Sequence, residues 1–249
     1  MLRRLLIGLI ALVVALGALV GIEILIALRR DYLPTDPALK LDDSFGEPGA
    51  DELTLVVLGD STAAGVGAGS PANAYPQVLA RRLADDGYRV DLQVFGASGA
   101  RAADVLREQI QTAIEAEPDL VFIGIGANDT THLTPLDDIR TDIAFALDKL
   151  EAQTSADIVI AGAPDMRAPA FLQPLRCLAG WRGRQVSGAI ADAGKEAGVA
   201  VVELAEKTGP LFGSDPDRYH SADNFHPSAA GYELWANAIY PVLSRALRG

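Results

Sequence analysis

The chain contains very little cysteine and no excess of positive charge. Its 249 residues include one cysteine, Cys177, so no disulfide can form within the chain. No partner motif surrounds Cys177, which predicts a packed or half-exposed thiol rather than a catalytic one. Lysine and arginine number 21 against 33 acidic residues, for a formal net charge of −12. Because nucleic-acid affinity comes largely from cations that neutralise phosphates, we expect no nucleic-acid partner.

Internal repeats and low-complexity tracts are also missing from the sequence. The composition is 49% apolar and 22% charged, which is typical of a globular protein and not of a disordered one. The length suits one α/β domain of ordinary size. We expect an N-terminal segment over residues 1–30, a Pro-, Asp- and Gly-rich linker over 31–52, and a single domain over 53–249.

The one long apolar run lies at the N-terminus. Leu5 to Leu28 carries a single charge, Glu23. As a helix this run would rise about 36 Å, enough to cross a hydrocarbon core of about 30 Å. It is longer than the apolar core of a signal peptide, and its best small-residue cleavage site, residues 15–17, lies inside the run. The run therefore predicts an uncleaved transmembrane helix. A cleaved signal peptide with a secreted product and a buried core helix are the alternatives.

The orientation of this helix follows from weaker signals. Arg3 and Arg4 on one side are nearly balanced by Arg29, Arg30 and Lys40 on the other. The short N-terminal tail indicates that it stays inside while the large domain is exported. We therefore expect a single-pass membrane protein with its domain outside the cytoplasm.

Beyond the linker, short apolar runs alternate with helical patterns. This alternation predicts βαβ units and a parallel sheet that is covered on both faces, a three-layer α/β/α sandwich. The expected strands are 53–58, 89–95, 120–125, 157–161 and 199–204. The expected helices are 75–86, 102–116, 137–153, 186–197 and 227–247.

Polar segments follow these strands at their carboxyl ends, where open α/β sheets bind their ligands. Ser61 follows the first expected strand, Gly99 the second and Asn128 the third. Asp223 and His226 follow the fifth strand, immediately before the last helix. The topology therefore predicts that all of these residues lie on one rim of the sheet.

Ser61, Asp223 and His226 together suit nucleophilic catalysis. A serine hydroxyl is a weak nucleophile until a base takes its proton. The spacing of Asp223 and His226 lets the carboxylate bond one ring nitrogen while the other faces Ser61. Taken singly, Ser61 could cap a helix, and Asp223 could be a capping residue beside a surface histidine. His220 is the main rival to His226 as the base.

Asn128 and Gly99 suit the stabilisation of a negatively charged oxygen. The Asn128 amide and the backbone N–H groups of Gly99 and Ser61 could donate hydrogen bonds to the oxyanion of a tetrahedral intermediate. Taken alone, an asparagine after a strand is equally typical of a turn. A lone glycine carries almost no signal.

The four segments together resemble the SGNH (GDSL-type) hydrolases, whose named residues are Ser, Gly, Asn and His in four blocks. The resemblance covers about residues 53–247, with its blocks at GDST (59–62), SGAR (98–101), GAND (126–129) and DNFHP (223–227). Two positions depart from the usual pattern. Thr62 stands where Leu or Ile is frequent, and Phe95-Gly96-Ala97 stands where the second block often has an asparagine. Neither departure removes a catalytic group.

The resemblance implies a flavodoxin-like SGNH fold and an esterase or lipase-like activity on carboxylic esters. It implies Ser61 as nucleophile, His226 as base, Asp223 as the residue orienting His226, and an oxyanion hole of Ser61, Gly99 and Asn128. The partner would be a small-molecule or lipid acyl ester, with the membrane contacted through the N-terminal helix. An acyltransferase, a carbohydrate deacetylase using the same site, or an inactive binding domain on this fold are the alternatives.

Cofactors and metals are not expected. Asp60 and Asp129 lack the clustered histidine or third carboxylate of a metal site, and we interpret them as residues that brace their loops. The glycines at 65, 67 and 69 do not have the spacing of a dinucleotide fingerprint, and no Gly-Lys-Ser/Thr motif follows. Pro164 to Trp181 is expected to form a long, proline-broken loop that either acts as a lid or simply packs on the domain.

Overall fold

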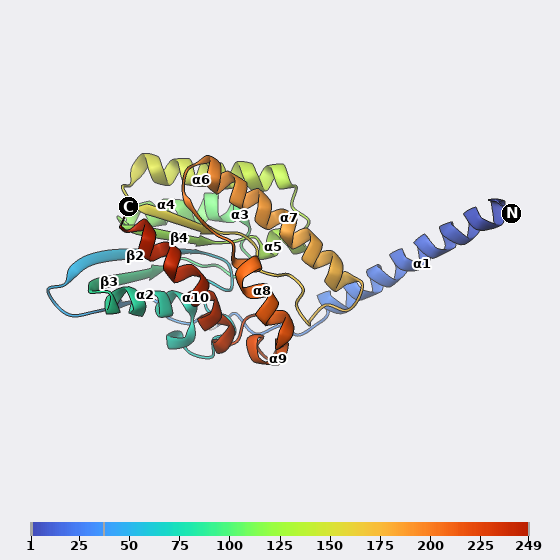
Figure 1. Cartoon of the computed structure of the whole chain (residues 1–249), viewed down its shortest axis with the longest axis horizontal. Helices are drawn as coiled ribbons and strands as arrows, with labels where there is room; N and C mark the ends of the chain where they lie inside the picture. Colours follow the sequence, from blue (N-terminus) through green and yellow to red (C-terminus); the bar gives the residue numbers. More distant parts are fainter. Residues whose placement is uncertain (1, 37, 249) are drawn as a thin grey trace.

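Six strands form one sheet between two helical layers in the computed structural model, which describes residues 2–36 and 38–248 (Figure 1). The strand order is β1-β3-β2-β4-β5-β6, and β2 to β6 are parallel. The strands are β1 (Asp43–Phe45), β2 (Asp51–Gly59), β3 (Tyr88–Val94), β4 (Leu120–Gly124), β5 (Asp157–Ala161) and β6 (Ala200–Val202). The α/β sandwich that the sequence predicts is therefore confirmed.

The helices divide between an N-terminal rod, the two layers and the loops that follow the strands. They are α1 (Leu2–Leu28), α2 (Tyr75–Asp85), α3 (Ala102–Asp104), α4 (Ile110–Glu115), α5 (Ala127–Thr131), α6 (Leu136–Gln153), α7 (Leu175–Glu196), α8 (Leu204–Ser214), α9 (Pro216–Tyr219) and α10 (Ala229–Ala246). A 3₁₀ turn spans Pro71–Asn73, and a π-helical segment, Val105–Gln109, joins α3 to α4.

Alternate residues of the central strand β2 feed two separate cores. Leu55 and Val57 pack on the side of α2, α8 and α10, whereas Val56 and Leu58 pack on the side of α4, α6 and α7. All four side chains are fully buried. Because successive side chains of a strand point to opposite faces, a strand covered on both faces must be apolar throughout. This explains why β2 and β4 are continuous apolar runs.

The strand count differs from the sequence-based prediction. The expected sheet had five parallel strands, but β1 adds a sixth, antiparallel to β3 and within the residues expected to form a linker. Its residues, Asp43-Ser44-Phe45, show no strand pattern of their own. The backbone pairing with β3 creates this strand, and such a pairing is invisible in a three-residue pattern.

The segment from Pro164 to Trp181 is also more ordered than expected. Only its first part is irregular, because α7 begins at Leu175. The second half of α7 agrees with the helix expected over 186–197, whereas glycines hid its first half from the sequence pattern. Gly180 and Gly183 bring α7 close to the preceding loop, where a Cβ atom would lie 2.4 Å from Arg167 Cγ and 2.6 Å from Met166 Cγ respectively. Similarly, α8 was not expected because it contains Gly209 and Pro210.

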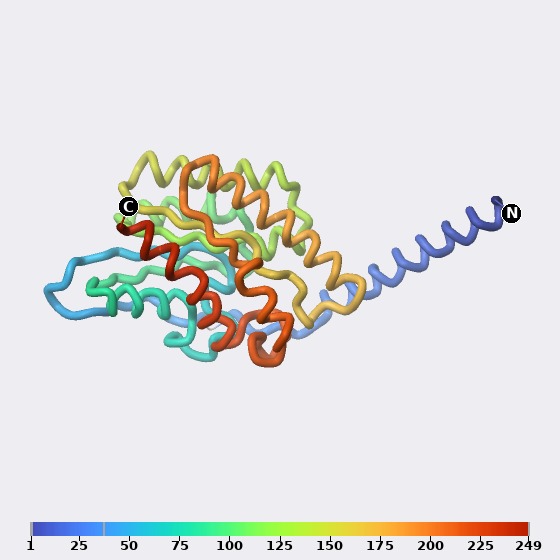
Figure 2. Tube along the Cα trace, viewed as in Figure 1, coloured from blue at the N-terminus to red at the C-terminus, as the bar shows by residue number. Residues whose placement is uncertain are grey.

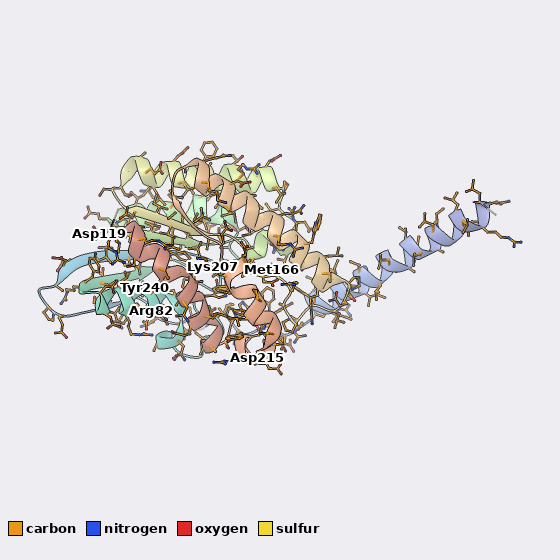
Figure 3. All side chains as sticks on the ribbon, viewed as in Figure 1. Arg82, Asp119, Met166, Lys207, Asp215 and Tyr240 are labelled. Carbon is orange, nitrogen blue, oxygen red and sulfur yellow. The ribbon has the colours of Figure 1, made fainter. Side chains whose placement is uncertain are left out.

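The N-terminal helix α1 projects from one end of the domain as a 27-residue rod (Figures 1 and 2). Its large apolar side chains stand in open space on all sides (Figure 3). It is long and apolar enough to cross a membrane. Length and composition alone are also compatible with a signal sequence.

Candidate active site

Ser61 follows a sharp turn at the end of β2. Gly59 has φ +151°, and a Cβ atom there would lie 2.2 Å from the carbonyl oxygen of Gly124 on the neighbouring strand. The Gln109 side chain brackets Gly59, accepting from its N–H at 2.9 Å and donating to its carbonyl at 2.8 Å. After the turn, Asp60 Oδ1 accepts from the N–H of Thr62 at 2.9 Å and from its hydroxyl at 2.8 Å. These bonds fix the backbone on both sides of Ser61.

A continuous series of hydrogen bonds joins Ser61, His226 and Asp223. Ser61 Oγ lies 3.0 Å from His226 Nε2, and His226 Nδ1 lies 2.7 Å from Asp223 Oδ2. An ionised carboxylate can only accept, so Nδ1 carries the proton and Nε2 is left to accept from the serine hydroxyl. His226 and Asp223 are 6% and 5% exposed, so the pair is largely shielded from water. The geometry suits proton transfer from serine to histidine.

The Asp223 carboxylate is surrounded by donors. Its Oδ1 accepts from the Ser221 hydroxyl at 2.8 Å and from the N–H groups of Phe225 and His226 at 2.9 and 3.0 Å. Its Oδ2 also accepts from the N–H of Leu33 at 3.2 Å. Burial disfavours the charged carboxylate, but the His226 ring and these backbone donors outweigh it and hold the pKa of Asp223 well below its usual range. Asp223 therefore stays ionised beside His226.

Asn128 occupies the first turn of α5, after Gly126 in the left-handed conformation at φ +119°. Its Nδ2 donates to the carbonyl of Ala100 at 3.0 Å, which ties it to the loop that carries Gly99. Gly99 has φ +85° and lies in an exposed turn, with no atom within 4 Å of the position a Cβ would occupy. The structure thus joins the Asn128 and Gly99 loops directly.

The other two histidines have different partners. His220 Nδ1 lies 3.1 Å from the Pro216 carbonyl, and its ring meets Phe212 edge to face at 5.0 Å. Burial lowers the pKa of His220. His132 is exposed, with Nδ1 2.8 Å from the Asn128 carbonyl. The histidine that lies beside Ser61 is therefore His226.

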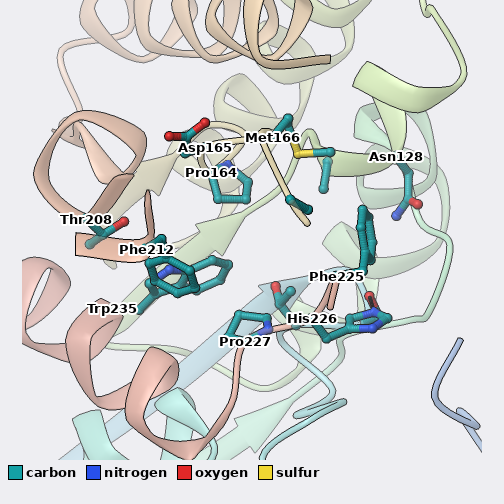
Figure 4. A pocket seen from close by; sticks show the side chains of 14 residues that line it. Asn128, Pro164, Asp165, Met166, Thr208, Phe212, Phe225, His226, Pro227 and Trp235 are labelled. Carbon is teal, nitrogen blue, oxygen red and sulfur yellow. Dashed lines mark hydrogen bonds between the residues drawn. The ribbon is translucent and has the colours of Figure 1, made fainter. Parts of the chain in front are cut away.

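Ser61, Asn128 and His226 line one pocket, whereas Asp223 lies behind His226 and Gly99 is not among the lining residues. In Figure 4, Phe225 stands between Asn128 and His226, and Phe212, Trp235 and Thr208 lie at the other end. The remaining lining residues are Thr62, Ala127, Pro164, Asp165, Met166, Ala168 and Pro227. The lining therefore combines apolar and aromatic side chains with polar groups, as ligand sites generally do.

Sequence patterns missed several residues that build this site. Phe225 packs edge to face on His226 at 5.2 Å and on Phe171 at 5.7 Å. Its position inside the DNFHP block is the one signal that could have marked it. Gln109 and Leu33 lie outside the four blocks and carry no motif. Their contacts with Gly59 and Asp223 arise from tertiary structure alone.

Comparison with known proteins gives a family. The family model of the GDSL-like lipases/acylhydrolases matches residues 57–234. A GDSL-like esterase of Mycobacterium tuberculosis is 34% identical over 199 residues, which cover 79% of this chain and 63% of the relative. The chain thus spans less than two thirds of that relative's length. Esterase TesA of Pseudomonas aeruginosa is 26% identical over 78% of this chain and 89% of the relative.

Solved structures agree in fold. A crystal structure of TesA aligns with a TM-score of 0.64 at 23% identity, covering 78% of this chain and 99% of that chain. The psychrotrophic esterase EstA from Pseudoalteromonas aligns with a TM-score of 0.61 at 18% identity, covering 79% of this chain and 99% of that chain. In both alignments the shared part is nearly the whole of the other protein.

Proposed function

Because the chain belongs to the GDSL-like lipase/acylhydrolase family, we propose that it is a membrane-anchored serine esterase that forms an acyl-enzyme on Ser61. The observation that carries this proposal is the hydrogen-bonded series Ser61–His226–Asp223 at the wall of a pocket. A buried carboxylate, an imidazole and a hydroxyl in this order form the general arrangement for activating a serine nucleophile.

In the first half of the reaction, Ser61 Oγ attacks the carbonyl carbon of the ester. Its proton passes to His226 Nε2 over the 3.0 Å hydrogen bond, and Asp223 stabilises the resulting imidazolium. The tetrahedral intermediate then collapses. Its bond to the alcohol oxygen breaks, and His226 returns the proton to the leaving alcohol. The acyl group remains on Ser61.

In the second half, a water molecule attacks the acyl-enzyme. His226 Nε2 accepts a proton from this water, a second tetrahedral intermediate forms, and the proton passes to Ser61 Oγ as the carboxylic acid leaves. The site returns to its starting state with one ester bond hydrolysed. An acceptor alcohol in place of water would make the same site an acyltransferase.

The oxyanion of both intermediates would be held by N–H donors of Ser61, Gly99 and Asn128. The Asn128 amide nitrogen carries two N–H bonds, and one of them is directed to the Ala100 carbonyl. That bond fixes the plane of the amide and leaves the second N–H for the substrate oxygen. A preorganised donor of this kind typically contributes about 3–4 kcal/mol of transition-state stabilisation.

Helix α1 supports the anchoring part of the proposal. Its 27 residues form one unbroken helix, and its apolar side chains are exposed along its length. Such a surface is unfavourable in water and favourable in lipid. We propose that α1 spans the membrane once, with the esterase domain outside the cytoplasm.

The test of the chemistry uses the full chain in lipid nanodiscs. We expect turnover of p-nitrophenyl esters, measured from acetyl to palmitoyl, and labelling of the protein by a fluorophosphonate probe. Ser61→Ala should abolish both, whereas the matched Ser155→Ala, at an exposed serine remote from the four blocks, should change neither. Turnover that persists in Ser61→Ala would refute the proposed nucleophile. Labelling without turnover would instead indicate a transferase.

The test of the anchor uses the membrane fraction of expressing cells. An uncleaved anchor predicts that the intact mass includes residues 2–28 and that the protein resists extraction by alkaline carbonate. A mass that begins after the apolar run would instead identify a cleaved signal peptide.

A further inference from the structure

Helix α1 is hydrogen-bonded to the domain, at the start of α7. Glu23 is the buried residue of α1, at 4% exposure, and its Oε2 accepts the N–H of Leu175 at 2.8 Å. Leu175 is the first residue of α7. A carboxylate that satisfies a free N–H at a helix start is a favourable pairing. This bond fixes the position of the first residue of α7 along the axis of α1.

Along the axis of α1, this bond lies within the apolar part of the helix. Glu23 precedes Leu28, the last residue of α1, by about 7.5 Å along the helix axis at a rise of about 1.5 Å per residue. The apolar run of about 36 Å exceeds a hydrocarbon core of about 30 Å by only a few ångströms. Once α1 spans a bilayer, the start of α7 therefore lies at the boundary between the headgroups and the acyl chains.

The residues around this bond have the chemistry of such a boundary. Leu172, Leu178 and Trp181 are 49%, 45% and 55% exposed, three large apolar side chains within ten residues. Tryptophan and leucine at the membrane interface lower the free energy by leaving water, and tryptophan is enriched there. The guanidinium of Arg176 donates to the carbonyls of Phe171 and Pro169 at 2.8 and 3.0 Å, so its partners lie in the loop just before α7.

We infer that residues 172–181 dip into the surface of the bilayer that α1 enters, so that the esterase pocket opens beside the lipid surface. This inference rests on the proposed anchoring by α1. The preceding loop links the segment to the pocket: Met166 and Ala168 line it, and Phe171 packs on Phe225, another lining residue, at 5.7 Å. Esters that reside in the membrane then reach Ser61 without crossing bulk water.

The chain offers a direct probe of this contact, because its single cysteine lies inside the segment. Cys177 is exposed and can be labelled with a nitroxide in the otherwise unaltered full chain. After reconstitution into palmitoyl-oleoyl-phosphatidylcholine vesicles, power saturation would compare its collisions with oxygen, which enters lipid, and with a nickel chelate, which stays in water. The control is the double variant Cys177→Ser/Phe145→Cys, which carries the label at a 56% exposed position on α6.

The expected result is a larger oxygen-to-nickel ratio for the label at Cys177 than for the label at position 145. Equal ratios at the two positions would overturn the inference, whatever the enzymatic activity. Protein that fails to co-float with the vesicles would instead refute the proposed anchor, which is a different failure.

A second measurement tests the consequence for substrates. The double variant Leu178→Asp/Trp181→Asp should lower the hydrolysis of p-nitrophenyl palmitate dissolved in vesicles by roughly tenfold, because charges oppose insertion at the interface. Hydrolysis of soluble p-nitrophenyl acetate should be unchanged, and Phe145→Asp should affect neither substrate. Equal activities of the double variant and Phe145→Asp on the vesicle substrate would contradict the inference. If the unmodified chain were inactive on both esters, the esterase proposal would be refuted. The label at Cys177 would then decide whether residues 172–181 contact the bilayer.

Discussion

The two halves of the site are assembled in different ways. In the proton-transfer half, Ser61, His226 and Asp223 are bonded to one another at 3.0 and 2.7 Å. In the oxyanion half, Asn128 and Gly99 are not bonded to each other, and Asn128 is held by the Ala100 carbonyl instead. The reason is chemical. Groups that alternate as donors and acceptors can form hydrogen bonds with one another, whereas two donors cannot bond to each other.

This difference predicts how each half responds to change. The proton-transfer half should fail as a unit, because every member depends on the next. The oxyanion half should fail in steps, because each donor is positioned by its own loop. The turns at Gly99 and Gly126, both with positive φ, position the oxyanion donors. Ser61, His226 and Asp223 are instead positioned by the hydrogen bonds between them.

The largest effect is expected from breaking the proton-transfer half. Ser61→Ala and His226→Ala should each lower kcat by at least about 10⁴-fold, and the double variant should be no worse than either single one. Steady-state kinetics with p-nitrophenyl acetate would measure all three. Losses that multiply in the double variant would show that Ser61 and His226 act independently.

The next effect is expected at Asp223. Asp223→Asn should lower kcat by about 10³–10⁴-fold, because an amide can donate to Nδ1 and favour the wrong histidine tautomer. Ser221→Ala is the control, since it removes one of the donors to the same carboxylate but leaves the charge. It should cost less than tenfold in kcat. Equal losses in the two variants would mean that loop geometry, and not the carboxylate, is what matters.

A smaller loss is expected at the oxyanion half. Asn128→Ala should lower kcat by about 10²–10³-fold with little change in KM, because the donor acts on charge that develops in the transition state. Asn128→Asp should lose more, since its carboxylate would face both the Ala100 carbonyl and the oxyanion. If Asn128→Asp proved as active as Asn128→Ala, this side chain would be removed from the proposed oxyanion hole.

The sequence predicted the architecture that carries both halves because periodicity reports burial. The continuous apolar runs of β2 and β4, and the strand-then-loop placement of Ser61 and Asn128, follow from burial on both faces of a parallel sheet. Strand β1 could not be predicted, because only its pairing with β3 makes it a strand. Glycines that allow close packing likewise masked the first half of α7, whereas its second half was expected as the helix 186–197.

The sequence was less informative about what holds the site residues in place. Ser61, Asn128 and His226 were expected on one rim, and the structure puts all three at one pocket. The Gln109 clamp on Gly59 and the Leu33 bond to Asp223 join residues about 50 and 190 positions apart. A motif records side-chain chemistry, whereas the Leu33 contact uses a backbone N–H that every residue except proline carries.

A smaller loss of activity is expected from a change at Gly99 in the oxyanion half. Gly99→Ala should lower kcat by about three- to tenfold, because a Cβ at φ +85° strains the turn and tilts its N–H, although the space around it is open. Gly87→Ala is a matched control, with φ +105°, open space and a position at the opposite end of the sheet. It should lose similar stability and no activity. A Gly99→Ala variant with full kcat would exclude this N–H from the oxyanion hole.

The smallest effect is expected from Leu33, which connects the segment after α1 to the proton-transfer half. Leu33→Pro removes the N–H that bonds Asp223 Oδ2. The pKa of Asp223, which its donors hold below the usual range, should then rise. A more basic carboxylate binds the His226 imidazolium more strongly, so the acid limb of kcat/KM should move to higher pH by about 0.3–1 unit. A merely structural defect would lower kcat/KM at every pH and leave the limb in place.

The same bond should contribute to stability with a definite dependence on pH. A carboxyl group whose folded pKa is depressed stabilises the native state above its unfolded pKa, and this contribution disappears as pH falls through the folded value. Leu33→Pro should therefore lower the free energy of unfolding by about 1 kcal/mol at pH 7, and the difference should narrow below about pH 4. Thr35→Pro is the control for the proline itself, at an exposed position two residues further along. The same pH profile and the same stability loss in the two variants would show that the hydrogen bond from Leu33 to Asp223 has no role of its own in the pH dependence. The contact between the segment after α1 and the Asp223 loop would then only fix their relative position.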